Sequence, residues 1–193
     1  MKHRSSLALF AHWEGIRGGR DCPERAEISP AALRTCLSDT FILTFDVSSS
    51  HPFRLAGTRV CNVFGRELRG NGFAGLWCEP DRPRITRLIS IVADEGIGIA
   101  AGAVGRTKDR ETLELELLLL PLRHHGRSHS RLIGTLAPAA APFWVGTKPL
   151  GGLALSDYRY VGSRTTAPAP VVRLPTARQR PELTVYDGGQ AAS

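Results

Sequence analysis

Hydrophobic positions along this 193-residue chain recur with a helical period in two segments. Residues 5–16 place Leu9, Trp13 and Ile16 on one face, at the i, i+4 and i+7 spacing of an amphipathic helix. Residues 81–95 carry an apolar stripe between an N-capping aspartate and a terminating glycine, which predicts a second helix. Each helix therefore has an apolar face that needs a surface to cover it.

Strand-like patterns account for five further segments, two before the second helix and three after it. Residues 40–46 and 53–57 flank a short polar loop and predict a hairpin, with Phe53 and Leu55 pointing inward. Glycines divide residues 58–80, where only short helical turns are expected. This order favours an α+β fold: a five-stranded antiparallel sheet with helices on one face, plus an N-terminal helix and a C-terminal extension. The three later strands are predicted at residues 96–105, 112–122 and 131–137.

Composition divides the chain into four parts. We expect an N-terminal helix and linker at residues 1–28, the α+β domain at 29–138 and a packed extension at 139–162. Residues 163–193 combine four prolines with scattered arginines and few apolar residues, which predicts a flexible tail.

The net charge of +7 comes from 25 basic against 18 acidic residues, and the basic residues are scattered. Because there is no basic run with interleaved aromatic residues, we do not expect nucleic acid as a partner; the tail arginines favour docking on a protein. No segment has the roughly 18 apolar residues of a membrane span. The N-terminal apolar run is too short for a secretory signal, so we place the protein in the cytoplasm.

Residue patterns that carry chemistry are sparse. The four cysteines lie far apart without a C-x-x-C pair, which predicts mostly buried thiols and neither a zinc site nor a disulfide framework. Three histidines between residues 124 and 129 lack a nearby carboxylate or cysteine to complete a metal shell, so no metal is expected. A G-x-S-x-G elbow, a phosphate-binding loop and a dinucleotide fingerprint are all missing from the sequence, and we do not expect an enzyme.

One short stretch, N-V-F-G-R-E-L-R-G at residues 62–70, directly follows the second predicted strand. PAS domains commonly carry a helical stretch at this place, followed by a glycine, an acidic residue, a leucine and a second glycine. The stretch resembles that signature through Gly65, Glu67, Leu68 and Gly70. Physically, the glycines permit sharp turns, and Glu67 is placed to accept backbone N–H groups or to pair with a neighbouring arginine.

Further pieces in the same order make residues 5–160 similar to a family of small stand-alone bacterial PAS proteins. They are W-x-x-x-R-G from Trp13, F-R-L-A-G-T from Phe53, L-P-L from Leu120 and R-x-x-G from Arg131. The resemblance implies a regulatory role in the bacterial cytoplasm. It also implies a homodimer formed through the N-terminal helix and the outer face of the sheet.

The resemblance implies that the fold can enclose a small molecule between the sheet and the short helices. We expect a filled core, although the glycine and alanine residues of 96–105 either leave room for a ligand or let a helix pack closely. Arg54 and Arg66 are candidate anchors for an anionic ligand. The candidate wall consists of Phe41, Leu43, Phe53, Leu55, Phe73, Trp77, Leu88, Val92, Leu115, Leu117 and Leu132.

Two cofactors of PAS relatives do not fit the sequence, and no cofactor is expected. Covalent flavin chemistry needs a reactive cysteine in an N-C-R-F-L-Q type motif, whereas Cys61 precedes an asparagine and Cys78 lies in W-C-E-P. A haem-binding PAS domain requires an axial histidine on the longer helix, and residues 81–95 contain no histidine.

These observations lead us to expect a non-catalytic PAS-fold signalling or adaptor protein that acts through protein–protein contacts. Whether a small ligand regulates these contacts is left open by the sequence. The alternative is a small-molecule sensor whose internal pocket selects an anionic or aromatic metabolite. Leu9, Trp13 and Ile16 are the candidate interface of a homodimer, because either a partner subunit or the sheet has to cover them. The sequence does not identify the protein partner.

Overall fold

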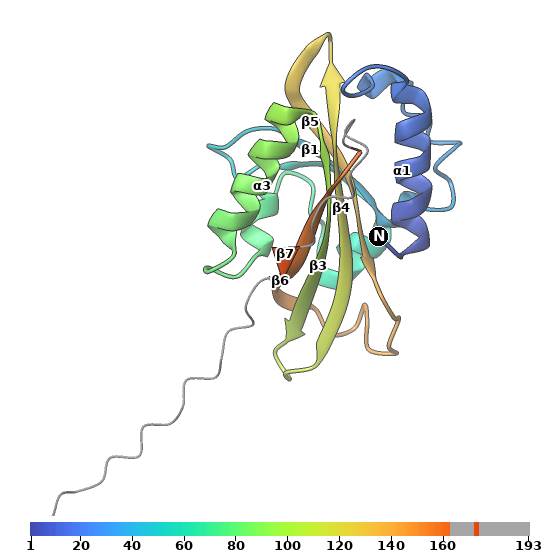
Figure 1. Ribbon diagram of the computed structural model, residues 1–193. Helices are drawn as coiled ribbons and strands as arrows, with labels where there is room; N and C mark the ends of the chain where they lie inside the picture. The colour runs from blue at the N-terminus through green and yellow to red at the C-terminus, as the bar shows by residue number, and fades with distance from the viewer. Residues whose placement is uncertain (163–171, 174–193) are drawn as a thin grey trace, which may run out of the picture.

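In the part of the chain that the structure describes, residues 1–162 and 172–173, seven strands form one antiparallel sheet (Figure 1). This computed structural model orders the strands β2-β1-β5-β4-β3-β6-β7. The strands are β1 (Thr40–Thr44), β2 (Phe53–Ala56), β3 (Gly98–Thr107), β4 (Thr112–His124), β5 (Arg127–Pro138), β6 (Leu150–Val161) and β7 (Val172–Arg173). The helices are α1 (Arg4–Arg17), α2 (Thr58–Phe64) and α3 (Arg82–Glu95), with 3-10 turns η1 (Arg25–Glu27), η2 (Leu37–Asp39) and η3 (Phe73–Leu76).

The predicted α+β fold class is confirmed. The five predicted strands form the block β2-β1-β5-β4-β3, and the two predicted helices are α1 and α3. Figure 1 views the sheet nearly along its plane, with α3 on one side, which we call the inner face, and α1 on the other, the outer face. Strand β6, within the segment where we expected a packed extension, pairs with β3 and enlarges the sheet.

Strand β4 shows how the two faces differ. Its first half alternates buried leucines with exposed or half-buried residues, the period of a strand covered on one side. From Leu117 to Leu122 every residue is buried, because α1 covers the outer face here while α2, η3 and α3 cover the inner face. The continuous apolar run is therefore the sequence pattern of a strand covered on both faces.

The pairing of β1 with β2 slips by one residue, and this corrects the predicted orientation of Leu55. Ile42 of β1 pairs with Leu55, but the next residue of β1 pairs with Phe53, so Arg54 is an extra residue in β2. A bulge of this kind moves the following side chains to the opposite face. Phe53 is consequently 1% exposed in the inner core, whereas Leu55 is 44% exposed.

Several expectations fall at the limits of the described chain. The predicted Pro/Arg-rich tail, residues 163–193, lies outside the described residues apart from β7. Among residues 1–162 and 172–173, no helix is long and apolar enough to span a membrane.

All four cysteines are free thiols. Cys22 and Cys36 are buried and Cys61 is half-buried. Cys78 is exposed, which differs from the expectation that the thiols are mostly buried.

Candidate functional site

The predicted ligand wall on the inner face is a filled aromatic core. The rings of Phe41, Phe53 and Phe73 lie 5.3–5.6 Å apart between centroids, and Trp77 lies 6.0 Å from Phe73. All four side chains are at most 1% exposed. Edge-to-face and offset contacts at these distances stabilise a core directly. The structure thus brings the aromatic candidates together, and their own rings occupy the space between the sheet and the short helices.

The remaining wall candidates divide between this core and its surroundings. Leu115 and Leu88 are buried in the same cluster, at 3% and 4% exposure. Arg54 and Arg66, the candidate anchors, are both exposed and do not enter the core. The exposure of Arg54 and Arg66 places both candidate anchors outside the filled aromatic core.

The residues of the signature at 62–70 end a helix, turn the chain and cap backbone N–H groups. Gly65 ends α2 in the left-handed conformation, at φ 62°, and Gly70 turns the chain at φ 81°. The Oε1 atom of Glu67 accepts the N–H groups of Leu68 and Arg69 at 3.0 and 3.1 Å. The N–H of Arg69, followed by that of Leu68 and the neighbouring thiol, lowers the pKa of the Glu67 carboxyl. Of the two predicted roles for Glu67, the structure shows the backbone cap.

Helix α1 covers the outer face of the sheet in the same chain, and this corrects the interface assignment. Leu9 and Trp13 are 0% exposed, and Ile16 is half-buried beside the same cluster. The indole Nε1 of Trp13 donates to the carbonyl of Pro121 in β4 at 2.9 Å. The sheet rather than a partner subunit therefore covers this apolar face.

The W-x-x-x-R-G pattern fixes the end of α1 to the end of β6. The guanidinium of Arg17 lies 4.7 Å from the centroid of the Trp13 ring and donates to the carbonyl of Gly162 at 2.8 Å. Gly18 then ends the helix with a φ of 58°. Sequence reasoning missed this tie because Gly162 lies 145 residues away from Arg17.

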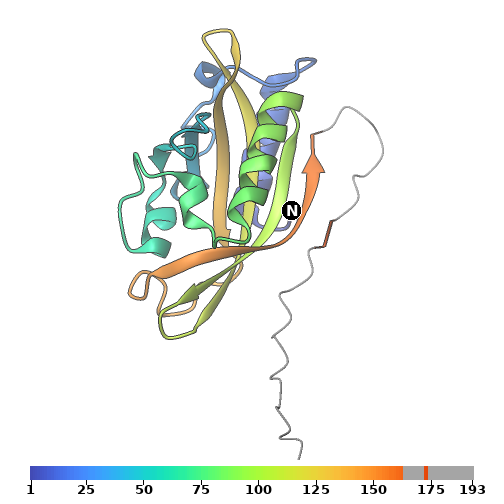
Figure 2. The same ribbon diagram turned by 90° about the vertical axis from the view of Figure 1, so that its left-hand side faces the viewer.

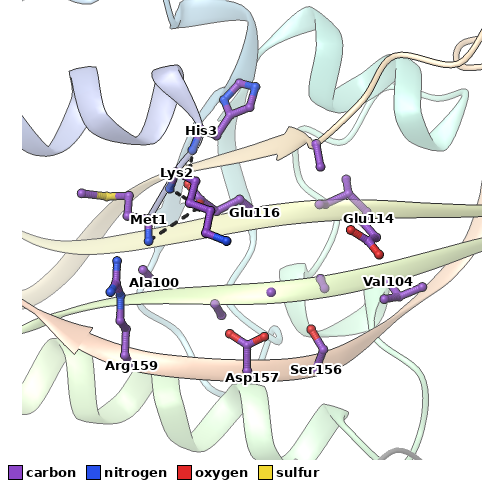
Figure 3. A pocket seen from close by; sticks show the side chains of 15 residues that line it. Met1, Lys2, His3, Ala100, Val104, Glu114, Glu116, Ser156, Asp157 and Arg159 are labelled. Carbon is purple, nitrogen blue, oxygen red and sulfur yellow. Dashed lines mark hydrogen bonds and ion pairs between the residues drawn. The ribbon is translucent and has the colours of Figure 1, made fainter. Parts of the chain in front are cut away.

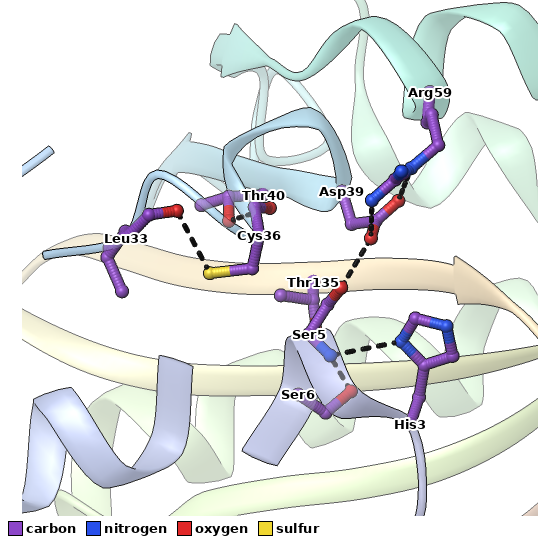
Figure 4. Close-up of polar contacts among 9 residues, drawn as sticks. All are labelled: His3, Ser5, Ser6, Leu33, Cys36, Asp39, Thr40, Arg59 and Thr135. Carbon is purple, nitrogen blue, oxygen red and sulfur yellow. Dashed lines mark hydrogen bonds and ion pairs between the residues drawn. The ribbon is translucent and has the colours of Figure 1, made fainter. Parts of the chain in front are cut away.

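A buried carboxylate anchors the start of α1, as Figure 4 shows. Asp39 is 0% exposed, and Arg59 of α2 donates to both of its oxygens at 2.6 Å. The hydroxyl of Ser5 donates to the same carboxylate, while Ser6 shares a hydrogen bond of 3.0 Å with Thr135 of β5. These contacts join α1 to η2, α2 and β5. No local pattern predicts these contacts, because a single aspartate before a strand has no partner that can be identified from the sequence.

Beyond the start of α1, the outer face is open and forms a groove of about 820 Å³ (Figure 3). We call it the outer groove. Its floor includes Ala100 and Gly102 of β3, and its polar wall includes Glu114 of β4 with Asp157 and Arg159 of β6. A Cβ at Gly102 would come within 2.9 Å of the Asp157 carboxylate, so glycine allows the strands' side chains to lie this close. The small residues of 96–105 therefore leave room on the outer face, not in the core.

One side of the outer groove is shaped by the first residues of the chain. The Glu116 carboxylate accepts the backbone N–H groups of Lys2 and His3 at 2.6 and 3.0 Å. These bonds place the segment before α1 across β4, as the dashed lines in Figure 3 show. The sequence signal for this wall is the period-two placement of Glu114 and Glu116 within an otherwise apolar strand.

The histidines that we considered as metal ligands lie around the β4–β5 hairpin: His124 ends β4, His125 is in the turn and His129 belongs to β5. The rings of His124 and His125 are 4.1 Å apart between centroids, and the side chain of His129 lies outside the described residues. Among the described side chains, no group of three histidine, cysteine, aspartate or glutamate residues gathers in a metal-binding arrangement.

A family model described as a PAS domain matches residues 1–137. The chain belongs to the PAS domain family. The match includes α1 and the strand block β2-β1-β5-β4-β3 as far as residue 137, and it confirms the resemblance to PAS proteins that the sequence motifs indicated. Membership places the chain, in general terms, among signalling and sensor domains.

Solved structures of light-oxygen-voltage (LOV) proteins resemble this PAS domain distantly. A LOV domain studied with a flavin analogue is 17% identical, with 57% of this chain and 83% of that chain covered and a TM-score of 0.45. A LOV protein of Rhodobacter sphaeroides is 12% identical, with 54% and 60% covered and a TM-score of 0.43. An RNA-binding LOV receptor is 19% identical, with 61% and 34% covered and a TM-score of 0.43. No curated protein matches the chain.

Proposed function

We propose that this PAS domain is a non-catalytic signalling protein of the cytoplasm, which acts through protein–protein contacts on its outer sheet face and forms a homodimer there. The observation that carries the proposal is the outer groove, an open surface on the sheet beside α1. It supports contact with a protein because the small residues of its floor allow another backbone to approach closely.

The charges of the outer groove support a second copy of the chain as one partner. Glu114 and Asp157 carry negative charge, and Arg159 carries positive charge on the same surface. In a two-fold dimer the same patch meets itself, so a surface that contains both signs can pair opposite charges across the axis. A patch of one sign would repel its copy.

Sedimentation equilibrium of a groove variant and a matched control tests the proposal. Val104 lines the groove and pairs with Glu114 across the strands, so Val104→Lys places a lysine where the fold tolerates it. Thr112 is exposed outside the groove at the start of β4, which makes Thr112→Lys the control. We expect Val104→Lys to raise the dimer Kd at least about tenfold, and Thr112→Lys to leave it unchanged.

Two results would overturn the homodimer. One is a wild-type chain that stays monomeric up to roughly 100 µM. The other is a dimer that both lysine variants weaken equally. In either case the outer groove would not be the self-association surface.

The second candidate function is a sensor of an anionic or aromatic metabolite. A smaller groove between α3 and β6, lined by arginine and tyrosine side chains, favours it. Native mass spectrometry of the protein purified from its own host, before and after denaturation, distinguishes the two functions. A small-molecule mass that is lost on denaturation supports the sensor, whereas a clean apo dimer supports the interaction protein.

A further inference from the structure

The groove between α3 and β6 lies on the inner face, where β6 extends the sheet beyond β3. Figure 2 shows β6, in orange, passing beside α3, in green. The groove has a volume of about 320 Å³, near the lower limit of about 300 Å³ for small-molecule sites. We call it the α3–β6 groove. Its lining includes Arg84, Arg87 and Leu88 of α3, and Leu155, Tyr158 and Tyr160 of β6.

We infer that the α3–β6 groove binds a small molecule that carries one anionic group on a flat aromatic body. The inference rests on the sensor role, the second candidate function above, and assigns that role a site. The site differs from the predicted internal pocket, because Leu88 and Leu155 close the groove toward the aromatic core and are themselves buried at 4% and 6% exposure.

The helix side of the groove supplies the positive charge. Arg84 and Arg87 are three residues apart on α3, a spacing that puts them on one face of the helix. Guanidinium groups match carboxylate and phosphate oxygens with paired N–H donors. Arg84 is partly neutralised by Asp81, at 3.1 Å, and Asp81 is held in place by the backbone N–H of Leu155 at 3.0 Å. Arg87 is therefore the anchor that we assign to the anion.

The strand side supplies the aromatic surface. The rings of Tyr158 and Tyr160 are 6.0 Å apart between centroids and meet at 81°, and both side chains are half-buried. A third flat ring gains favourable contact with such a pair by stacking or by an edge-to-face arrangement. Burial, and then the nearby Tyr158 and Glu95, raise the pKa of the Tyr160 hydroxyl. That hydroxyl stays protonated at neutral pH and is available to donate a hydrogen bond.

The charges along α3 define an orientation for the ligand. Arg84 and Arg87 line the groove toward the start of α3. Glu95, the last residue of the helix, lies outside the lining but close enough to Tyr160 to help raise the pKa of its hydroxyl. An anion is attracted to the arginines and repelled by Glu95. The outer groove is independent of this site, because successive side chains of β6 point to opposite faces of the sheet.

Isothermal titration of the full chain with three probes tests the site. The probes are 2-naphthoate, indole-3-acetate and phenyl phosphate, and the neutral control is 2-naphthamide. We expect saturable binding of at least one anionic probe below roughly 5 mM, and binding of 2-naphthamide that is at least about tenfold weaker. Arg87→Gln should weaken the anionic probe at least about tenfold, because it removes the charge and keeps the side chain's polarity. The matched control is Arg106→Gln, an exposed arginine of β3 outside the groove.

The site fails if none of the three anions binds saturably, or if Arg87→Gln and Arg106→Gln have the same effect. Circular dichroism of both variants confirms that they fold, which we expect because both side chains are exposed. Failure of the site and failure of the sensor role are distinguishable by native mass spectrometry. A host-derived ligand retained equally by wild type and Arg87→Gln supports the sensor role and overturns this site.

Discussion

Replacement of Trp13 by alanine should weaken the fold itself rather than the association of two chains. The indole is 0% exposed between α1 and the sheet, donates to the carbonyl of Pro121 and lies under the guanidinium of Arg17. Alanine removes the ring, leaves a cavity against β4 and β6, and leaves the Pro121 carbonyl without its donor. The substitution therefore removes both the hydrogen bond of α1 to Pro121 and the ring on which the Arg17 guanidinium lies.

The magnitude follows from these contacts. Truncation of a buried tryptophan to alanine costs about 3–5 kcal/mol, which includes the cavity. The lost hydrogen bond contributes about 1 kcal/mol and the cation–π contact about 0.5–1 kcal/mol. Because these contributions overlap, we expect the free energy of unfolding to fall by about 4–6 kcal/mol. That is a large part of the roughly 5–15 kcal/mol that typically stabilises a domain.

Urea unfolding followed by circular dichroism measures this loss. Leu7→Ala is the matched control, because Leu7 lies on the same helix but is 48% exposed, and we expect a change within about 0.5–1 kcal/mol. Trp13→Phe keeps most of the ring and removes the Nε1 donor, so it should lose about 1–2 kcal/mol and remain folded. This variant keeps the prediction measurable if Trp13→Ala does not fold.

A loss below about 1 kcal/mol for Trp13→Ala would refute the docking of α1 on the sheet. A stable Trp13→Ala variant with weakened self-association would instead restore the interface assignment that the sequence suggested. The two readings differ because one changes the urea midpoint of the chain and the other changes its sedimentation.

Two further predictions concern buried polar groups. Arg59→Met leaves the buried carboxylate of Asp39 without its guanidinium partner. Because the Arg59 side chain is 42% exposed, we expect the free energy of unfolding to fall by about 2–3 kcal/mol, less than for a fully buried pair. Arg66→Met, at an exposed site, is the control, and equal urea midpoints of the two variants would contradict the prediction. Burial lowers the pKa of His51 below its ordinary value of 6.5, so the unfolded chain binds this proton more readily than the folded one, and stability is lost as the pH falls through about 6.5 toward the lowered value. His51→Asn, which suits the positive φ of 58° there, should reduce the loss in urea midpoint between about pH 7.5 and 5.5, and an identical loss in both proteins would disprove the assignment.

Most of the fold could be predicted from local patterns, because the strands and the two long helices each carry their own periodicity. The misplacement of Leu55 shows the limit: alternation assumes a regular strand, and an extra residue at Arg54 becomes visible only when β2 is paired with β1. Strand β6 was harder to recognise because adjacent glycines at its start interrupt the apolar pattern. Its pairing with β3 is a tertiary contact that no local pattern specifies.

The candidate site was predictable only in part, for a related reason. Phe41, Phe53 and Phe73 were assigned to one cluster correctly, because inward-facing aromatic residues of neighbouring elements meet in the core. Whether they surround a ligand or contact one another depends on distances that the sequence does not contain. Both grooves lie beside β6, so they depend on the placement of a strand that was expected only as a packed extension.

Strand β6 also determines how the sheet ends. It pairs with β3 from Gly98 to Thr107, and β3 consists largely of glycine and alanine, which offer no bulky or charged side chain to shield an open backbone. The family match stops at residue 137, before β6 begins. A chain shortened to that boundary would expose the N–H and C=O groups of β3 as an unprotected edge strand, the feature through which sheets aggregate or exchange strands. The segment after the PAS match therefore moves the edge of the sheet from β3 to β6, and β7 pairs with β6 only at Asp157 and Tyr158 among the described residues.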